Sequence, residues 1–290
     1  MLHILLAILV LQSGLAEPRP AGDLPEHDEF LRNVRSQLRS DRLLQSQYTF
    51  NLKVTESRLD KKGNVEKTEV NEYEVYPSLE EDLTYTKHVS KNGIRLKSGE
   101  IEKQDRKHNK KLAKRQKMLS KEDSDDRTRR LAREAEEKRR EEEIIDEVFQ
   151  LYDISMAGRE RIEGHSAIRL DFRPRPEYKP SSREAKILSK FAGRAWFCEE
   201  DFQLIRIETG LIENLSFLKG ILARIHKGTE FTFQRRRIND EIWLPAEQHI
   251  SGTARVLLFK KIRFKYVYEY SDYKKFTVGT EIKYLSDKQP

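Results

Sequence analysis

The residues that could do chemistry in this chain are few and widely spaced. Gly164-His165-Ser166 matches only part of the Gly-x-Ser-x-Gly signature of a nucleophilic serine. The seven histidines lack the spacing of metal ligands, and the sequence has no glycine-rich phosphate loop. Cys198, the only cysteine, follows Trp196 and Phe197 in a predicted strand, where we interpret it as a small buried side chain. We therefore expect a protein that is not an enzyme and has no metal and no cofactor.

Apolar and aromatic side chains carry the remaining functional signal. They recur with a period of two in many short segments, and this alternation is typical of half-buried strands. Each such strand has one apolar face and one polar face. The apolar faces either fill an ordinary core or leave part of a cavity open for a ligand. The alternation itself is compatible with both.

Residues 47–76 predict a long antiparallel hairpin around which the rest of the sheet is built. The first arm alternates from Tyr48 to Val54, and the second ends before Pro77, which cannot donate a hydrogen bond to a strand ladder. Between them, Asp60 and Gly63 suit the two ends of a tight turn. A hairpin alone is only marginally stable, so its apolar face must meet further strands, a helix or a ligand.

Further alternating segments predict a large sheet. They cover residues 83–89, 153–163, 164–174, 193–199 and 202–212, and a long last strand that contains Phe264 and Tyr266. Helices are predicted at residues 26–45 and 181–192; the second begins with a Ser181–Glu184 capping box and is stopped by Gly193. A twisted sheet of this size must curl. We predict an α+β fold: a large curved antiparallel β-sheet that forms an open half-barrel covered by helices.

Residues 100–147 form a highly charged insertion, for which we predict one or two exposed helices. Seven of the thirteen residues from Asp105 to Lys117 are Lys or Arg. This segment is either a solvated insertion or a docking surface for phospholipid headgroups or an acidic partner. The candidate docking residues are Lys110, Lys111, Lys114 and Arg115.

The N-terminal residues predict export. Residues 1–16 contain an unbroken apolar run followed by small residues, the pattern of a cleaved signal peptide. Residues 17–46 then form a spacer and a helix, and residues 47–285 a single half-barrel domain. We expect a periplasmic or otherwise extracytoplasmic monomer that does not bind nucleic acid, although the formal net charge is +7.

This layout resembles the LolA-like family of periplasmic lipoprotein carriers, the outer membrane lipoprotein-sorting proteins. The resemblance rests on the N-terminal helix, the hairpin, the strand at 164–174, the lid-like helix, and Gly193-Arg194-Ala195-Trp196-Phe197 running into Asp201-Phe202-Gln203. The family is an unclosed β-barrel with a helical lid and a hydrophobic cavity for acyl chains. The long basic insertion departs from that layout.

The resemblance implies a soluble exported protein that binds lipid or lipoprotein acyl chains. The candidate cavity residues are Tyr48, Phe50, Leu52, Val54, Tyr73, Val75, Leu170, Phe172, Leu188, Phe191, Trp196, Ile205, Ile207, Phe264 and Tyr266. The alternative is an envelope protein-interaction or sensing module with the same fold, whose interior is filled by its own side chains and which docks through the charged helices.

Overall fold

The computed structural model describes residues 23–38, 42–217, 223–256 and 260–276. The predicted signal segment, residues 1–16, and the last residues of the predicted domain, 277–285, lie outside this range. The helices are α1 (His27–Gln37), α2 (Arg42–Gln45), a 3-10 turn η1 (Glu81–Leu83), α3 (Ser98–Leu119), α4 (Ser124–Leu151) and α5 (Arg183–Leu188).

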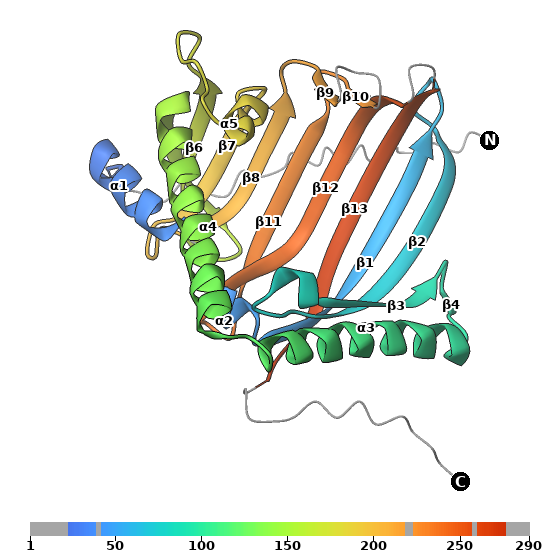
Figure 1. The fold of residues 1–290 in the computed structure, drawn as a ribbon. Coiled ribbons are helices and arrows are strands. Elements are labelled where there is room, and N and C mark those ends of the chain that lie inside the picture. The colour runs from blue at the N-terminus through green and yellow to red at the C-terminus, as the bar shows by residue number, and fades with distance from the viewer. Residues whose placement is uncertain (1–22, 39–41, 218–222, 257–259, 277–290) are drawn as a thin grey trace, which may run out of the picture.

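The described strands form one thirteen-stranded antiparallel sheet (Figure 1). They are β1 (Tyr48–Leu59), β2 (Val65–Tyr76), β3 (Tyr85–Lys91), β4 (Ile94–Arg95), β5 (Tyr152–Ile162), β6 (His165–Pro174), β7 (Phe191–Cys198), β8 (Leu204–Leu211), β9 (Leu215–Phe217), β10 (Ala223–Ile225), β11 (Glu230–Ile238), β12 (Ile242–Val256) and β13 (Lys260–Lys275).

The sheet is open, as the sequence predicted. Its hydrogen-bonded order is β4-β3-β2-β1-β13-β12-β11-β8-β7-β6-β5, so that β4 and β5 are the two edges and β9 and β10 form a short flap on β12. The predicted hairpin is confirmed as β1 and β2. It lies inside the sheet because the last strand, β13, pairs along the whole of β1.

The turn of this hairpin is set by two residues. The Asp60 carboxylate accepts hydrogen bonds from the backbone N–H groups of Lys62 and Asn64, at 2.7 and 2.8 Å. Gly63 has a φ of 91°, a left-handed conformation that glycine adopts without strain. The chain therefore reverses into β2 directly after β1.

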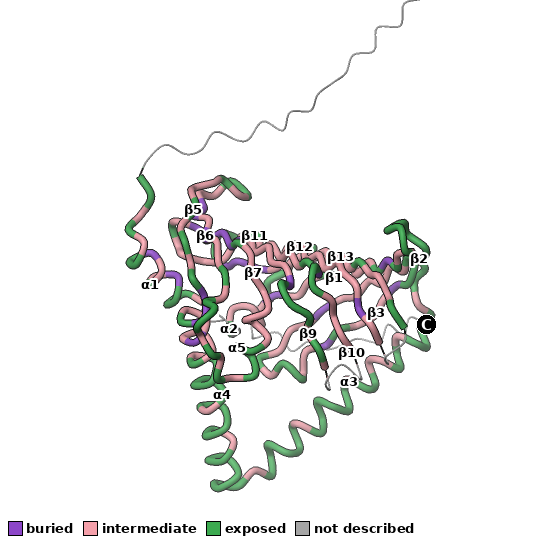
Figure 2. Tube along the Cα trace, turned by 90° about the horizontal axis from the view of Figure 1, so that it is seen from above, coloured by how far each residue is buried: buried purple, intermediate pink, exposed green. Residues whose placement is uncertain are grey.

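The charged insertion forms two long helices on one side of the sheet. α3 packs against β3, α4 leads into β5, and Figure 2 shows the two helices converging away from the sheet. None of the residues of α3 is buried, whereas α4 buries Glu147 and Leu151 near its end. The two helices therefore frame the sheet at its two edges.

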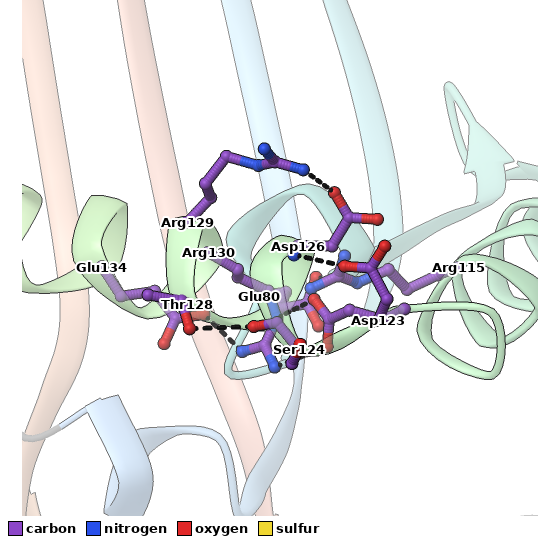
Figure 3. A network of polar contacts seen from close by, with 10 residues as sticks. Glu80, Arg115, Asp123, Ser124, Asp126, Thr128, Arg129, Arg130 and Glu134 are labelled. Atoms are coloured by element: carbon purple, nitrogen blue, oxygen red, sulfur yellow. Dashed lines mark hydrogen bonds and ion pairs between the residues drawn. The ribbon is translucent and has the colours of Figure 1, made fainter.

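A network of ion pairs surrounds the junction of α3 and α4 (Figure 3). Arg130 donates two hydrogen bonds to Glu122, at 2.8 and 3.0 Å, and a third to Glu134 at 3.0 Å. Arg115 pairs with Glu80, which precedes η1, at 2.7 Å. Single exposed pairs contribute about 0–1 kcal/mol each, but a network with shared partners restrains both helices at this junction.

Two predicted helices differ from the structure. The segment predicted as one helix over residues 26–45 contains α1 and α2. The helix predicted over residues 181–192 ends at Leu188, and Phe191 already belongs to β7. Its N-cap is Ser182, whose hydroxyl accepts from the N–H of Ala185 at 3.0 Å. Gly193 was predicted to stop the helix, but it lies inside β7.

Gly193 is required by the close approach of β8. A Cβ atom at this position would lie 2.1 Å from the carbonyl oxygen of Glu208, a backbone atom that cannot move without disturbing the ladder. Gly210 lies on the partner strand and pairs with Ala192, but a Cβ atom there would have no atom within 4 Å. The two glycines therefore form a matched pair for testing the fold.

We predict that Gly193→Ala destabilises the protein by about 1–3 kcal/mol, the usual cost of overpacking. The matched variant Gly210→Ala should leave the free energy of unfolding unchanged or raise it slightly. Urea unfolding followed by circular dichroism measures both. Equal stability of the two variants would contradict the β7–β8 register described above.

Candidate functional site

An apolar cavity of about 480 Å³ lies between the sheet and the helices α1, α4 and α5. This volume falls within the range of about 300–1,000 Å³ that is usual for ligand pockets. The helices contribute Val34, Leu38, Val148, Phe149 and Leu188 to its wall. The strands and their ends contribute Tyr152, Ile154, Leu170, Phe172, Phe191, Ala195, Phe197, Leu204, Ile207, Thr209, Leu211, Leu215, Ile225, Thr229, Phe231 and Ile250.

The hydroxyl groups of the wall donate to the backbone. The Tyr152 hydroxyl donates to the carbonyl of Leu188 at 2.6 Å, and burial raises the pKa of this phenol far above its ordinary value. The hydroxyls of Thr209 and Thr229 donate to the carbonyls of Ala192 and His226, both at 2.9 Å. None of the described residues that line the cavity is charged. A ligand in this cavity would be recognised by its shape and by the burial of its apolar surface.

Strand alternation explains how the sheet supplies this wall. Leu170 and Phe172 on β6 alternate with polar residues, and pairing continues the row from Phe172 through Gly193 and Thr209 to Phe231. Phe30 and Val34 of α1 pack on the same face of the sheet, beside the cavity, in a buried cluster that includes Leu170 and Phe197. Because α1 covers only part of this face, the space beside it stays open.

Helix α5 is fastened at both ends. At its start the buried Glu147 carboxylate accepts hydrogen bonds from Ser181 N–H and Oγ, at 2.7 and 2.9 Å, and from Ser182 N–H at 3.3 Å. At its end Leu188 accepts the hydrogen bond from Tyr152. Burial alone would raise the pKa of Glu147, but the hydrogen bonds from Ser182 and Ser181 outweigh burial and hold this pKa below its ordinary value. Glu147 is therefore a charged anchor for the helix that covers the cavity.

One row of this face becomes polar beyond the cavity. The row that contains Phe231 and Ile250 continues through Tyr266 to Glu56. Burial and then a hydrogen bond with Glu56 raise the pKa of Tyr266 to about 12, so this phenol stays neutral. Glu56 itself is exposed. This row therefore runs from apolar side chains at β11 and β12 to a hydroxyl and a carboxylate group at β13 and β1.

Five of the fifteen candidate residues lie in the cavity wall: Leu170, Phe172, Leu188, Phe191 and Ile207. Seven others lie on the same face over β13, β1 and β2 by strand register, but outside the wall: Phe50, Leu52, Val54, Tyr73, Val75, Phe264 and Tyr266. These mostly apolar side chains flank the polar end of the row formed by Tyr266 and Glu56.

The remaining three candidates were expected to line the cavity, but they lie elsewhere in the structure. Trp196 and Ile205 belong to a buried cluster with Cys198 and Trp243. Alternation turns Trp196 to the opposite face of the sheet from its neighbours Ala195 and Phe197. Ile205 joins Trp196 on that face because the ladder between β7 and β8 has a bulge there, with Trp196 opposite Arg206 and Phe197 opposite Leu204. Tyr48 lies in a third cluster at the start of β1, where its hydroxyl donates to Glu241.

Sequence reasoning missed much of the wall. Phe231 and Ile250 alternate as clearly as Leu170 does, but nothing in the sequence shows that β11 and β12 lie beside β8. Phe149 follows three apolar residues at the end of a charged helix, and this change in composition was the available signal. Val34 is on the apolar stripe of α1, where a core position was the simplest interpretation.

The basic docking candidates divide into two pairs. Lys110 and Lys114 are exposed. Lys111 and Arg115 lie near the polar loop before β3, where Lys111 pairs with Asp82 at 3.5 Å and Arg115 with Glu80. The second pair therefore fixes α3 to the sheet.

One group of potential metal ligands occurs among the described residues. Ligand atoms of His165, Cys198 and Glu200 lie within 4.8 Å of one another. The Cys198 thiol is buried, and burial raises its pKa, so it is protonated at neutral pH. Glu200 pairs with Arg237 at 3.6 Å. A neutral thiol beside an exposed ion pair is a poor match to a metal centre, and we assign no metal to this group.

The partial serine motif is likewise occupied by structural contacts. The Ser166 hydroxyl donates to Glu199 at 2.7 Å, and Glu199 also accepts from Arg159 at 2.6 Å. The His165 ring lies edge-on to Trp243, with 4.9 Å between ring centroids. These contacts join β5, β6 and β7.

No helix within the described ranges has both the length and the apolar character of a membrane span.

We predict that Glu147→Ala loosens α5, because the Ser181 and Ser182 N–H groups lose their acceptor at a cost of about 1–3 kcal/mol. Hydrogen exchange at the amides of α5 should accelerate, while exchange in β7 stays slow. Lowering the pH should also accelerate exchange at these amides. Because the pKa of Glu147 is lowered in the folded protein, the contribution of this carboxylate to stability is present at neutral pH and is lost as the pH falls through that pKa. Glu137→Ala, an exposed change on the same helix, is the control, and equal exchange in both variants would contradict the anchor.

No protein-family model matches this chain. The curated proteins also include no match.

Solved structures similar to the chain include proteins of the expected kind. A DUF1329 family protein from Desulfovibrio piger is 10% identical, with 88% of this chain and 94% of that chain covered and a TM-score of 0.30. A putative outer membrane lipoprotein-sorting protein domain from Vibrio parahaemolyticus is 11% identical, with 88% and 93% covered and a TM-score of 0.30. The Pseudomonas aeruginosa MucA/MucB complex gives 8% identity, coverage of 84% and 93%, and a TM-score of 0.21. The lipoprotein-sorting group that the sequence resembles is thus among the structural neighbours.

Proposed function

We propose that this protein is an exported, non-catalytic carrier or sensor that holds an acyl chain of a lipid or lipoprotein in the cavity. The observation that carries the proposal is the chemistry of the wall: among the residues that the structure describes, none that lines it is charged, and its three hydroxyl groups donate to backbone carbonyls. Such a wall offers hydrocarbon contact and little else.

The energetics favour an apolar chain as the cargo. Hiding an acyl chain of about 16 carbons from water is worth up to about 12 kcal/mol at about 0.8 kcal/mol per methylene. An empty apolar cavity also forfeits the dispersion contacts of its lining. Filling this one with a flexible chain restores those contacts.

The polar end of the row at Tyr266 and Glu56 supports an orientation for the cargo. The chain end would lie under α5 and against Phe172, and the carboxyl, ester or headgroup would point toward Tyr266 and Glu56 on β13 and β1. A neutral tyrosine can both donate and accept a hydrogen bond. The cargo would therefore be an amphiphile with an apolar tail and a polar head.

The competing function is a protein-interaction module with no cargo. The observation that favours it is the exposure of the α3–α4 pair, since α3 buries none of its side chains. Under this alternative the cavity is a packing defect, and amphiphiles should bind no better than they bind to an unrelated protein of similar charge.

We predict that Ile250→Trp lowers the affinity for a dansyl-labelled fatty acid at least about tenfold, or ~1.4 kcal/mol, because the indole occupies the space of the tail. His249→Trp is the matched control: it adds the same ring one residue earlier on β12, on the other face of the sheet, and should bind like the wild type. Fluorescence titration measures both.

Organic extracts of the purified protein give a second readout. Mass spectrometry should find a co-purifying amphiphile at a stoichiometric level in the wild type and much less in Ile250→Trp. Equal binding by the two tryptophan variants, or a wild type that takes up no fatty acid, would support the protein-interaction module.

A further inference from the structure

Helix α3 carries a line of lysines on its outer face. Lys103, Lys107, Lys110, Lys114 and Lys117 follow one another at spacings of four, three, four and three residues, and all five are exposed. Side chains at these spacings lie on one face of a helix. We call these five residues the lysine stripe. It extends over about 21 Å at ~1.5 Å per residue.

The opposite face of α3 holds the helix to the sheet. The Gln104 side chain makes two hydrogen bonds with the backbone of His88, at 2.9 and 3.0 Å. Asp105 accepts from the Tyr85 hydroxyl at 2.5 Å, and His108 stacks on the Tyr85 ring with 4.3 Å between centroids. This face therefore fixes the rotation of α3 about its axis and keeps the lysine stripe pointing outward.

The charge of α3 is one-sided. The helix has eight Lys or Arg residues against three Asp or Glu, and none of the acidic residues follows Asp105. Among the described residues, no ion pair involves Lys107, Lys110 or Lys114, whereas Lys111 and Arg115 on the flank pair with Asp82 and Glu80. The stripe is thus a row of outward positive charges next to basic residues that are already neutralised.

We propose that the lysine stripe docks the protein on an anionic phospholipid bilayer. The stripe is straight, as a flat surface requires, and it contains only lysine. Lysine is a flexible, strongly hydrated point charge that suits a field of mobile headgroups, while a specific protein interface usually employs the planar fork of arginine. α3 lies on the same side of the sheet as α4 and α5 (Figures 1 and 2), the helices that line the cavity, so that docking would bring that side to the membrane. The surface goes beyond the proposed cargo and does not depend on it.

Co-sedimentation with vesicles tests the stripe. The probes are vesicles of phosphatidylcholine alone and of an equimolar mixture of phosphatidylcholine and phosphatidylglycerol. The wild type should bind the anionic vesicles, bind the neutral ones hardly at all, and dissociate as salt screens the charges. The variant Lys107→Gln, Lys110→Gln, Lys114→Gln should lose on the order of 100-fold in affinity for the anionic vesicles.

A charge-matched control separates the stripe from net charge. Lys62→Gln, Lys179→Gln, Lys227→Gln removes three exposed lysines outside α3 and should bind nearly as the wild type does. Equal loss in both triple variants, or no preference of the wild type for anionic vesicles, would overturn the proposal. So would binding to duplex DNA or to polyglutamate that is tighter than binding to the vesicles at the same salt concentration.

The cavity variant keeps the two proposals apart. Ile250→Trp should dock on anionic vesicles like the wild type even though its fatty-acid affinity falls. If the stripe variant keeps its vesicle binding while Ile250→Trp loses fatty-acid binding, the docking surface is wrong and the cavity proposal stands.

Discussion

The structure depends on hiding one apolar face of a wide open sheet. Thirteen strands supply more of this face than three short helical segments can cover, so α1, α5 and the end of α4 shield the β5–β11 half and leave about 480 Å³ beside them. Water in such a space would have almost no hydrogen-bonding partner. The cavity is thus a consequence of how the sheet is covered, and the apolar chain that we propose as its ligand would fill it.

Two polar side chains near the cavity form hydrogen bonds at the two ends of α5 and leave the wall of the cavity apolar. Tyr152 and Glu147 both serve α5, one by donating to its last carbonyl and the other by accepting from the N–H groups before its first turn. Each of these two side chains has its hydrogen-bonding groups paired and at the same time holds α5 over the cavity. A hydrocarbon wall with a polar frame can exchange an apolar tail when the frame opens, without breaking any direct hydrogen bond to that tail.

Much of this could be predicted from the sequence, and the limits have a physical cause. Alternation identified the β1–β2 hairpin, the open antiparallel sheet and five wall residues. It could do so because the alternation of apolar and polar side chains is visible within each strand, without knowledge of its neighbours. It did not show that β13 inserts beside β1, or that β11 lies beside β8, since strand order depends on long-range pairing. Trp196 was assigned to the cavity on the family resemblance, whereas its position on β7, between Ala195 and Phe197, turns its side chain to the other face. Gly193 resembled a helix stop and instead allows two strands to approach.

The central claim is that the acyl chain lies against the β6–β12 face. Methyl NMR with a spin-labelled stearic acid tests it directly, because paramagnetic broadening reports proximity to the chain. The account predicts broadening of the methyl signals of Ile154, Ile207, Ile225 and Ile250, with Ile205 and Ile242 unaffected. Broadening of Ile205 to the same extent as Ile207, or no broadening at a saturating concentration of the label, would contradict it.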